Sequence, residues 1–278
     1  MEKFVDLHIH TTYSDGNLSP KEVVNCAYER RLAALSIADH DTTFGIPEAI
    51  EECQKKEIEL IPAVELSIKL KEVFEEIHLL GYYIDWQNQK LQEILKFLRD
   101  KRKERASQIY NKLEILGIKL GSEILDKISA NNSSVGRLHF ARTLVKQGHV
   151  QNISQAFQLY LNQGKPAYVD KIRLEPNEAI QLLLQVNGIP VLAHPYFNPV
   201  EPVLETLISY GLKGVEVWHS KHPSTFTQKL MLLAKKLGLL VTGGSDYHGE
   251  TDNRLPLIGS LKIPYSIVDE LKQCASQI

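Results

Sequence analysis

The feature that most constrains the fold is an alternation of strand-like and helix-like segments that is interrupted once. Apolar runs of strand length fall at Phe4–Ile9, Ala34–Ala38, Leu60–Val64 and Ile77–Ile84. Between them, helices are predicted to begin at Pro20, where Ser19 and Glu22 form a capping box, and at Ile46. After Glu175 the alternation resumes, with strands predicted over 189–193, 214–218 and 239–242. Such alternation is typical of a parallel sheet covered by helices.

The interruption covers residues 87–175, where only helical periodicity is visible. Leu91, Leu95 and Leu98 have helical spacing, as do Ile109 and Leu113 farther along. Shorter helices are predicted over 122–128, 137–147 and 154–162. We therefore predict an α/β fold of about seven strands, a β/α barrel made by residues 1–86 and 176–278, with residues 87–175 inserted as a helical domain.

Charge is divided between the same two regions. Residues 87–175 contain 16 Lys and Arg but only 8 Asp and Glu, whereas the whole chain has a net charge of -2. The insertion is therefore basic and the predicted barrel is acidic. A basic segment suits a ligand that carries phosphate, and an acidic body suits cation binding, although two solvated surfaces would look the same. The most basic stretch is Lys96, Arg99, Lys101, Arg102, Lys103 and Arg105, which would attract a polyanion such as RNA.

Two further features bear on the class of protein. No apolar run is long enough to span a membrane, and the first residues lack the layout of a signal peptide, so we expect a cytoplasmic enzyme without membrane association. The 3 cysteines have no CxxC pairing, which disfavours a disulfide framework and a thiolate metal site. No nucleotide-binding glycine motif and no obligate protein partner are evident.

Histidines and carboxylates gather where the predicted strands end. His8 and His10 alternate on one strand, so their side chains point to the same side of it. A lone histidine on a strand is more often a hydrogen-bonded core residue, and an HxH pair alone is a weak signal. The joint set is stronger, because many buried polar groups at one barrel face would be costly without a counter-ion. Its members are His8, His10, Asp15, His40, Glu65, His78, His194, Asp246 and His248.

Mixed imidazole and carboxylate ligands suit Zn²⁺, Mn²⁺ or Fe²⁺ better than Mg²⁺ or Ca²⁺. The nine side chains exceed what one ion needs, so two or three divalent ions are expected. Such a cluster activates a bridging hydroxide for attack on phosphorus and stabilises the leaving oxygen. The sequence therefore predicts a metal-dependent phosphoesterase that needs no organic cofactor.

The strings VDLHIHTTYSDG, ADHDT, PAVELS, IHLLGYY, LAHP and GGSDYHG, in this order, resemble the motifs of the PHP (polymerase and histidinol phosphatase) family. The resemblance covers nearly the whole chain and implies a distorted seven-stranded β/α barrel with a trinuclear metal centre. Mn²⁺ is the first expectation, with Fe, Zn or Mg as alternatives. The resemblance implies one ion held by His8, His10, Glu65 and Asp246, a second by Glu65, His78 and His194, and a third by Asp15, His40 and His248.

The insertion is similar to one branch of that family, the nucleoside 3′,5′-bisphosphate phosphatases, some of which resemble 5′→3′ exoribonucleases. The similar residues are Ser134 to Arg142, then Ala156-Phe157 and Gly164 to Val169. The resemblance implies that the insertion covers the active site. Arg137, His139 and Arg142 would then bind the substrate, through the phosphate that is not cleaved. A guanidinium also suits this role chemically, because its planar fork matches phosphate oxygens.

The expected substrate is thus a phosphorylated nucleotide, cleaved to the monophosphate, with 5′→3′ trimming of short 5′-phosphorylated RNA as a further activity. His8, His10, Glu65 and Asp246 are the expected catalytic residues. His219, just after a predicted strand, would orient the phosphate or protonate the leaving oxygen. Two alternatives stay open: a phosphatase for histidinol phosphate or another small phosphate, and a catalytically silent metal-binding accessory module.

Overall fold

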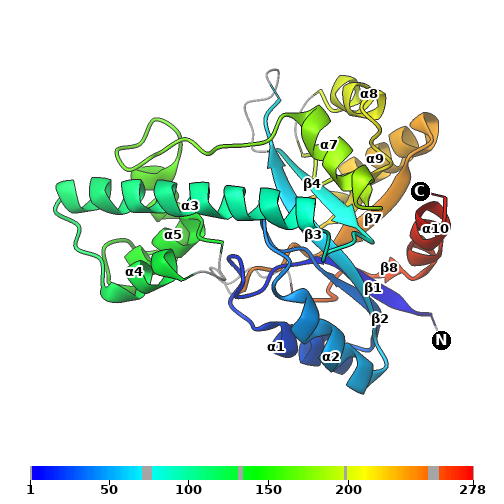
Figure 1. The fold of residues 1–278 in the computed structure, drawn as a ribbon, viewed down its shortest axis with the longest axis horizontal. Helices are drawn as coiled ribbons and strands as arrows, with labels where there is room; N and C mark the ends of the chain where they lie inside the picture. The colour runs from blue at the N-terminus through cyan, green and yellow to red at the C-terminus, as the bar shows by residue number, and fades with distance from the viewer. Residues whose placement is uncertain (1, 71–76, 131–133, 197–198, 250–256, 278) are drawn as a thin grey trace.

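The computed structural model of the chain describes residues 2–277 except 71–76, 131–133, 197–198 and 250–256 (Figure 1). One sheet of eight strands, in the order β7-β6-β5-β4-β3-β2-β1-β8, forms the body of the molecule. Neighbours are parallel except at the pairs β3–β4, β4–β5 and β1–β8. The strands are β1 (Phe4–Ile9), β2 (Leu32–Ile37), β3 (Glu59–Ile68), β4 (Ile77–Tyr82), β5 (Ile189–Leu192), β6 (Gly214–His219), β7 (Leu240–Gly244) and β8 (Ile263–Pro264).

The sheet curls so that the end of β7 returns to β1. The Asp246 amide donates to the His8 carbonyl at 2.9 Å, and the His10 amide donates to the Tyr247 carbonyl at 3.0 Å. This approach requires a glycine at position 244, because a Cβ there would lie 2.3 Å from the Cβ of His8. The sheet is therefore nearly closed, and its closing seam passes beside the HxH pair.

The predicted α/β barrel-like class is confirmed, with two differences in the strands. All seven predicted strands are present, but β8 adds a two-residue strand that is too short to show in a sequence pattern. β3 is also longer than expected, because residues 59–62 pair with β2 and residues 63–68 continue into an antiparallel pair with β4.

Helices cover the outside of the sheet (Figure 1). The predicted capping box at the first helix is present: the Ser19 hydroxyl accepts from the Glu22 amide at 3.3 Å, and the Glu22 carboxylate accepts from the Ser19 amide at 2.7 Å. The covering helices are α1 (Pro20–Glu29), α2 (Ile46–Lys56), α7 (Pro176–Gln185), α8 (Glu201–Ser209), α9 (Ser224–Leu237) and α10 (Ser266–Ala275). None of the helices in the described ranges is long and apolar enough to cross a membrane.

Between β4 and α7 the described chain is helical, as predicted for the insertion. Its elements are α3 (Gln89–Ile115), α4 (Ser122–Ser129), α5 (Arg137–Lys146), α6 (Ile153–Ala156) and a π-helix, η1 (Phe157–Leu161). α3 is a single 27-residue helix that extends from the sheet into the insertion (Figure 1). Its first turns pack Leu91 and Leu95 against the sheet, whereas Ile109 and Leu113 belong to a separate core with Phe140. One continuous helix therefore joins the two regions.

Candidate metal centre

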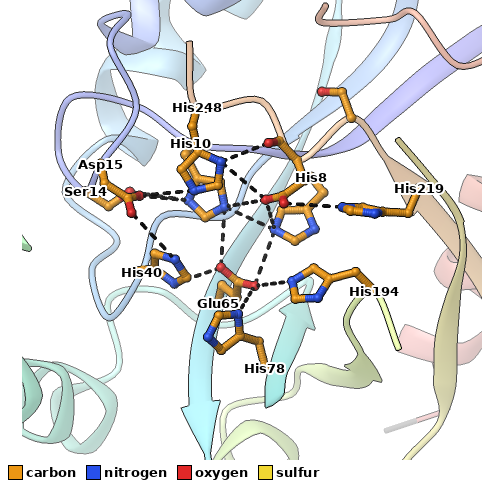
Figure 2. A network of polar contacts seen from close by, with 12 residues as sticks. His8, His10, Ser14, Asp15, His40, Glu65, His78, His194, His219 and His248 are labelled. Atoms are coloured by element: carbon orange, nitrogen blue, oxygen red, sulfur yellow. Dashed lines mark hydrogen bonds and ion pairs between the residues drawn. The ribbon is translucent and has the colours of Figure 1, made fainter. Parts of the chain in front are cut away.

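The nine predicted ligands come together at one end of the sheet, at or just after the ends of β1, β2, β5 and β7 and within β3 and β4 (Figure 2). Glu65 lies at the middle: its carboxylate is 2.7 Å from His40 Nδ1, 2.9 Å from His78 Nδ1 and 3.1 Å from His194 Nε2. Four overlapping sets have ligand atoms within 4.8 Å of one another. They are His10, Asp15, His40 and His248; His8, His10 and Asp246; His8, Glu65 and His194; and His40, Glu65 and His78.

These sets agree in part with the three that the family resemblance implies. Asp15, His40 and His248 occur together, with His10 added, and Glu65 is shared between sets as expected of a bridging carboxylate. Asp246 pairs with His8 and His10 but not with Glu65 within one set. The nine-residue cluster is thus brought together, while the assignment of residues to individual ions stays a prediction.

Hydrogen bonds around the cluster fix which imidazole nitrogens face inward. His8 Nδ1 lies 3.1 Å from the Glu216 carboxylate, so this nitrogen carries the proton and donates it. His10 Nδ1 lies 3.4 Å from Ser14 Oγ, whose own hydroxyl donates to Asp39 at 2.6 Å. The Nε2 atoms of His8 and His10 therefore both present lone pairs, although they are only 3.1 Å apart. Two lone pairs that face each other fit a shared cation.

Buried atoms without hydrogen bonds also fit bound metal. Among the described residues, Asp15 Oδ1 and Glu65 Oε2 have no hydrogen bond of acceptable geometry, although His40 Nδ1 is 2.7 Å from the latter. Buried polar atoms in proteins are nearly always satisfied, so such atoms in a His and carboxylate cluster indicate an ion position. The donor set of imidazoles and carboxylates suits a transition metal, so the residues fit the group that the sequence predicts.

Electrostatics at the site favour a positive charge. Burial raises the pKa values of Asp15, Glu65 and Asp246, but nearby histidines outweigh burial and hold all three pKa values well below the ordinary range. Burial lowers the pKa of His248, but Asp15 and Asp246 outweigh it and raise this pKa to about 9. Burial dominates at His40, where the pKa falls to about 4. The carboxylates are therefore ionised, and a divalent cation would take the place of the protons that they attract.

Strained backbone surrounds the cluster. His194, Asp246 and Asp41, which follows His40, all have positive φ angles of 29°, 53° and 54°, in a region that non-glycine residues seldom adopt. Such conformations persist where the surroundings hold them, and they concentrate at functional sites. Here they turn the chain just after three strands, and that turn aims the side chains inward.

The sequence prediction missed three carboxylates that support the cluster. Glu216, fully buried on β6, accepts from His8 and from the His194 amide at 2.8 Å. Asp39 accepts from the Thr11 amide and hydroxyl at 2.7 and 2.6 Å, and Asp6 accepts from the amides of Ser245 and Gly259 at 2.9 and 2.8 Å. A charged residue inside an otherwise apolar strand, as in GVEVWH, was the available signal.

His219 lies beside the cluster rather than in the cavity wall. Its Nδ1 accepts from the Lys221 amide at 3.2 Å, so its Nε2 carries the proton and points to Asp246 Oδ2 at 3.3 Å. The side chain is buried, and it is not among the described residues that line the cavity at the barrel mouth. The geometry thus makes His219 a partner of Asp246, while its predicted contact with substrate stays a prediction.

A cavity of about 720 Å³ opens over the cluster, and basic residues line it together with the candidate ligands. Seven of the nine candidate ligands line it, namely Asp15, His40, Glu65, His78, His194, Asp246 and His248. The basic residues that line it are Arg102, Arg105, Arg137, Lys171 and Lys221. Arg137 was predicted as a substrate contact, and Arg102 and Arg105 as part of the basic stretch that would attract a polyanion, whereas Lys171 and Lys221 were missed. Apolar side chains of Leu138, Ile153 and Phe157 complete the wall on the side of the insertion.

The three substrate-binding residues predicted on α5 are placed differently from one another. Arg137 lines the cavity, with its guanidinium 5.5 Å from the centre of the Phe157 ring. His139 is buried and its Nδ1 accepts from the Gly136 amide at 3.1 Å, while burial lowers its pKa to about 4. The described lining includes neither His139 nor Arg142. Only Arg137 is therefore in a position to contact a ligand in this cavity.

Comparison with known proteins places the chain in a family. The model of the PHP domain matches residues 6–170. The 3′,5′-nucleoside bisphosphate phosphatase of Chromobacterium violaceum is 34% identical over 88% of this chain and 87% of its own length. The 5′-3′ exoribonuclease Rnm of Escherichia coli is 34% identical over 87% of this chain and 84% of its own length.

A solved structure from Bifidobacterium adolescentis, assigned as a metal-dependent phosphoesterase, has a TM-score of 0.89 and 28% identity, and covers 98% of this chain and 96% of its own. A Chromobacterium violaceum structure, described as an amidohydrolase with bound sulfate and no metal, has a TM-score of 0.84 and 31% identity, and covers 97% of this chain and 96% of its own. Both the sequence relatives and these folds extend over the barrel and the insertion together. The chain belongs to the PHP domain family of metal-dependent phosphoesterases.

Proposed function

We propose that this enzyme hydrolyses nucleoside 3′,5′-bisphosphates to monophosphates and, as a second activity, trims short 5′-phosphorylated RNA in the 5′→3′ direction. The observation that carries the proposal is a single cavity with a metal-ligand wall and a basic wall facing the same space. A substrate with two phosphates matches these two walls, one phosphate at each. The names of two relatives, a bisphosphate phosphatase and an exoribonuclease, support the same substrate class.

Two or three divalent ions, with Mn²⁺ as the first candidate, would be held by His8, His10, Asp15, His40, Glu65, His78, His194, Asp246 and His248. When bound, such ions lower the pKa of water and offset negative charge at phosphorus. Fe, Zn or Mg are the alternatives that this donor set allows. Glu65 would bridge two ions, since its two oxygens contact histidines of different sets.

The remaining side chains bind and orient the substrate. Glu216 and Ser14 keep His8 and His10 in the tautomer that directs Nε2 inward. Lys221, with 75% of its side chain exposed and its Nζ 3.6 Å from Asp246, is placed to meet an incoming phosphate. Arg137 and Arg105 would hold the phosphate that is not cleaved, because a guanidinium can form two hydrogen bonds to one phosphate. The insertion, residues 87–175, would thereby cover the active site and select the substrate.

The cavity also has room for a nucleoside. Its volume lies within the range of about 300–1,000 Å³ that is usual for small-molecule sites. Phe157 and Ile153 provide apolar surface beside Arg137, which suits the planar base of a nucleotide. A small phosphate such as histidinol phosphate would leave that surface unused.

A substrate panel tests the proposal. With Mn²⁺ or Mg²⁺ added, phosphate release would be measured from a nucleoside 3′,5′-bisphosphate, its two monophosphates, histidinol phosphate and a 5′-phosphorylated oligoribonucleotide. We expect the bisphosphate to have the highest kcat/KM and the oligonucleotide to be shortened from its 5′ end. If histidinol phosphate were the best substrate and neither nucleotide were cleaved, the substrate assignment would be wrong. Inactivity on every ester would instead favour a silent accessory module.

A further inference from the structure

Arg142 makes two contacts that no substrate role explains. On α5 of the insertion, its Nη1 donates to the Asp15 carbonyl at 2.6 Å and its Nη2 donates to the His248 carbonyl at 2.7 Å. These carbonyls belong to different loops, one after β1 and the other after β7. The rigid fork of a guanidinium can hold two acceptors at once in a fixed relation. Arg142 therefore fastens two barrel loops to each other and to the insertion.

Both loops carry candidate ligands of the same ion. Asp15 and His248 belong to one set with His10 and His40, and His248 Nε2 lies 3.3 Å from Asp15 Oδ1. Arg142 contacts the main chain of these residues and leaves their side chains free to point at the ion position. The bond from the His10 amide to the Tyr247 carbonyl already joins the two loops where they leave their strands, and Arg142 adds a link at Asp15 and His248 themselves.

The rest of this set is also tied to the insertion. Arg102 on α3 forms an ion pair with Asp41, and Arg99 donates to the Asp41 carbonyl at 3.1 Å. Asp41 directly follows His40 in the chain. In addition, the Ser134 amide donates to the Tyr13 carbonyl at 2.8 Å, in the same loop as Asp15. Three of the four ligands in this set are therefore held from the insertion side.

The ligands on the opposite side of the cluster are oriented by residues of the barrel. His8, Glu65 and His194 form a set of their own, and the partner that orients two of them is Glu216 on β6. Glu65 and His78 lie on paired strands of the sheet. The insertion reaches this side at Ser67, through the Lys171 side chain and the Leu174 amide, and these contacts are to a neighbour of the ligands rather than to a ligand residue.

We infer that Arg142 is a positioning residue through which the helical insertion completes one metal position, the one formed by His10, Asp15, His40 and His248. The inference rests on the proposed metal cluster. α5 then has a second role besides carrying Arg137. Binding of an ion at this metal position and packing of the insertion over the cavity become coupled through Arg142. A loosened insertion would lose the ion on its own side first.

The test compares Arg142→Met and Arg142→Lys with a control, Lys146→Met, on the same helix. Lys146 is exposed, and its Nζ pairs with the carboxylate of the surface residue Glu123 at 2.7 Å. Each purified protein is freed of metal, titrated with Mn²⁺ by calorimetry, and measured for Mn²⁺ per chain by elemental analysis. We expect Arg142→Met to bind its weakest Mn²⁺ about 10- to 100-fold less tightly, the usual effect of losing a group that orients ligands. The tighter Mn²⁺ positions should be unchanged.

The affinity of Arg142→Lys for its weakest-bound Mn²⁺ should lie between those of the wild type and Arg142→Met. The reason is that an ammonium can hold one carbonyl but not both in a fixed geometry. Activity of both variants should recover as Mn²⁺ is raised, which a general loss of folding would not allow. Equal Mn²⁺ stoichiometry and affinity in Arg142→Met and Lys146→Met would overturn the inference while leaving the proposed function intact. If the wild-type enzyme bound no Mn²⁺, the inference and the proposed metal cluster would fail together.

Discussion

The barrel and the insertion hold their charged side chains in opposite ways. In the barrel, histidines and carboxylates lie at or near strand ends, buried or half-buried, and gather around Glu65. In the described part of the insertion, the buried charged side chains are basic: Arg99, Arg102 and Arg105 on one face of α3, and Lys171. The first arrangement gathers negative charge for cations, and the second presents positive charge to an anion. The two regions meet in one cavity. We assign the chemistry to the barrel residues and the selection of substrate to the residues of the insertion.

The largest expected effect comes from the centre of the barrel cluster. Glu65→Gln keeps the shape of the side chain but removes the charge and one metal-binding oxygen. We expect kcat to fall on the order of 1,000-fold or more, since metal-ion stabilisation contributes several kcal/mol and each 1.36 kcal/mol is tenfold in rate. The matched control is Glu59→Gln at the other end of β3, where the carboxylate pairs with Lys272 at 2.8 Å. Similar loss in both variants would contradict a special role for Glu65.

A smaller effect is expected from replacing a residue that orients a candidate ligand without binding metal itself. Glu216→Gln keeps an acceptor for His8 but removes the negative charge that orients and polarises it. Metal affinity should fall about 10- to 100-fold, as it does for other groups that orient ligands. Calorimetric titration with Mn²⁺ checks this, with Glu201→Gln on the surface of α8 as control, where the carboxylate pairs with Lys236 at 2.7 Å. Unchanged affinity would show that His8 does not need Glu216.

The insertion should affect selection rather than chemistry. Arg137→Ala should lower kcat/KM for a nucleoside 3′,5′-bisphosphate about 10- to 100-fold, because a hydrogen bond to a charged group contributes about 1.5–3 kcal/mol. The kcat/KM of a simple monophosphate should change far less, and bound Mn²⁺ should not change. Lys146→Ala on the same helix, which removes only an exposed ion pair with Glu123 at 2.7 Å, serves as control. Equal losses on both substrates would remove the distinction between the two regions.

The smallest effect concerns RNA. The sequence suggested that the whole basic stretch from Lys96 to Arg105 would attract a polyanion, but the structure divides this stretch between two faces of α3. The arginines are buried, whereas Lys96 pairs with Asp100 at 2.7 Å and Lys101 pairs with Glu104 at 2.8 Å. Lys96→Ala should therefore change the Kd for 5′-phosphorylated RNA by no more than about fivefold, since exposed pairs contribute about 0.2–1 kcal/mol. A binding titration at fixed salt measures it, and a larger loss would place RNA along the exposed face.

Functional side chains could be predicted from the sequence better in the barrel than in the insertion, and the reason is physical. His8, His10 and Glu65 could be predicted because side chains alternate along a strand and parallel strands end at one edge of a sheet. Position in the chain therefore nearly determines position in space. On α5, by contrast, the direction of each side chain depends on how the helix is rotated and packed. Arg137 lines the cavity, whereas Arg142, five residues later, donates hydrogen bonds to the main chains of two barrel loops.

Supporting residues were harder to predict than the cluster itself. Glu216 has no motif, since what distinguishes it is burial beside His8, and burial is a property of the folded chain. Lys171 and Arg105 reach the cavity from segments 66 residues apart, which only the path of the insertion brings together. The π-helix that places Phe157 in the wall likewise gave no sequence signal, because its apolar spacing is close to that of an α-helix.

The most direct test of the two-walled site is a crystal structure of the enzyme with Mn²⁺ and a bisphosphate analogue whose ester oxygens are replaced by methylene groups. Anomalous scattering would locate the ions, and the electron density would locate both phosphorus atoms. We expect two or three Mn²⁺ ions among the nine barrel ligands, one phosphonate against them, and the other against Arg137 and Arg105. A second phosphonate that points to solvent, with no contact to the insertion, would contradict the proposed role of the insertion in binding substrate.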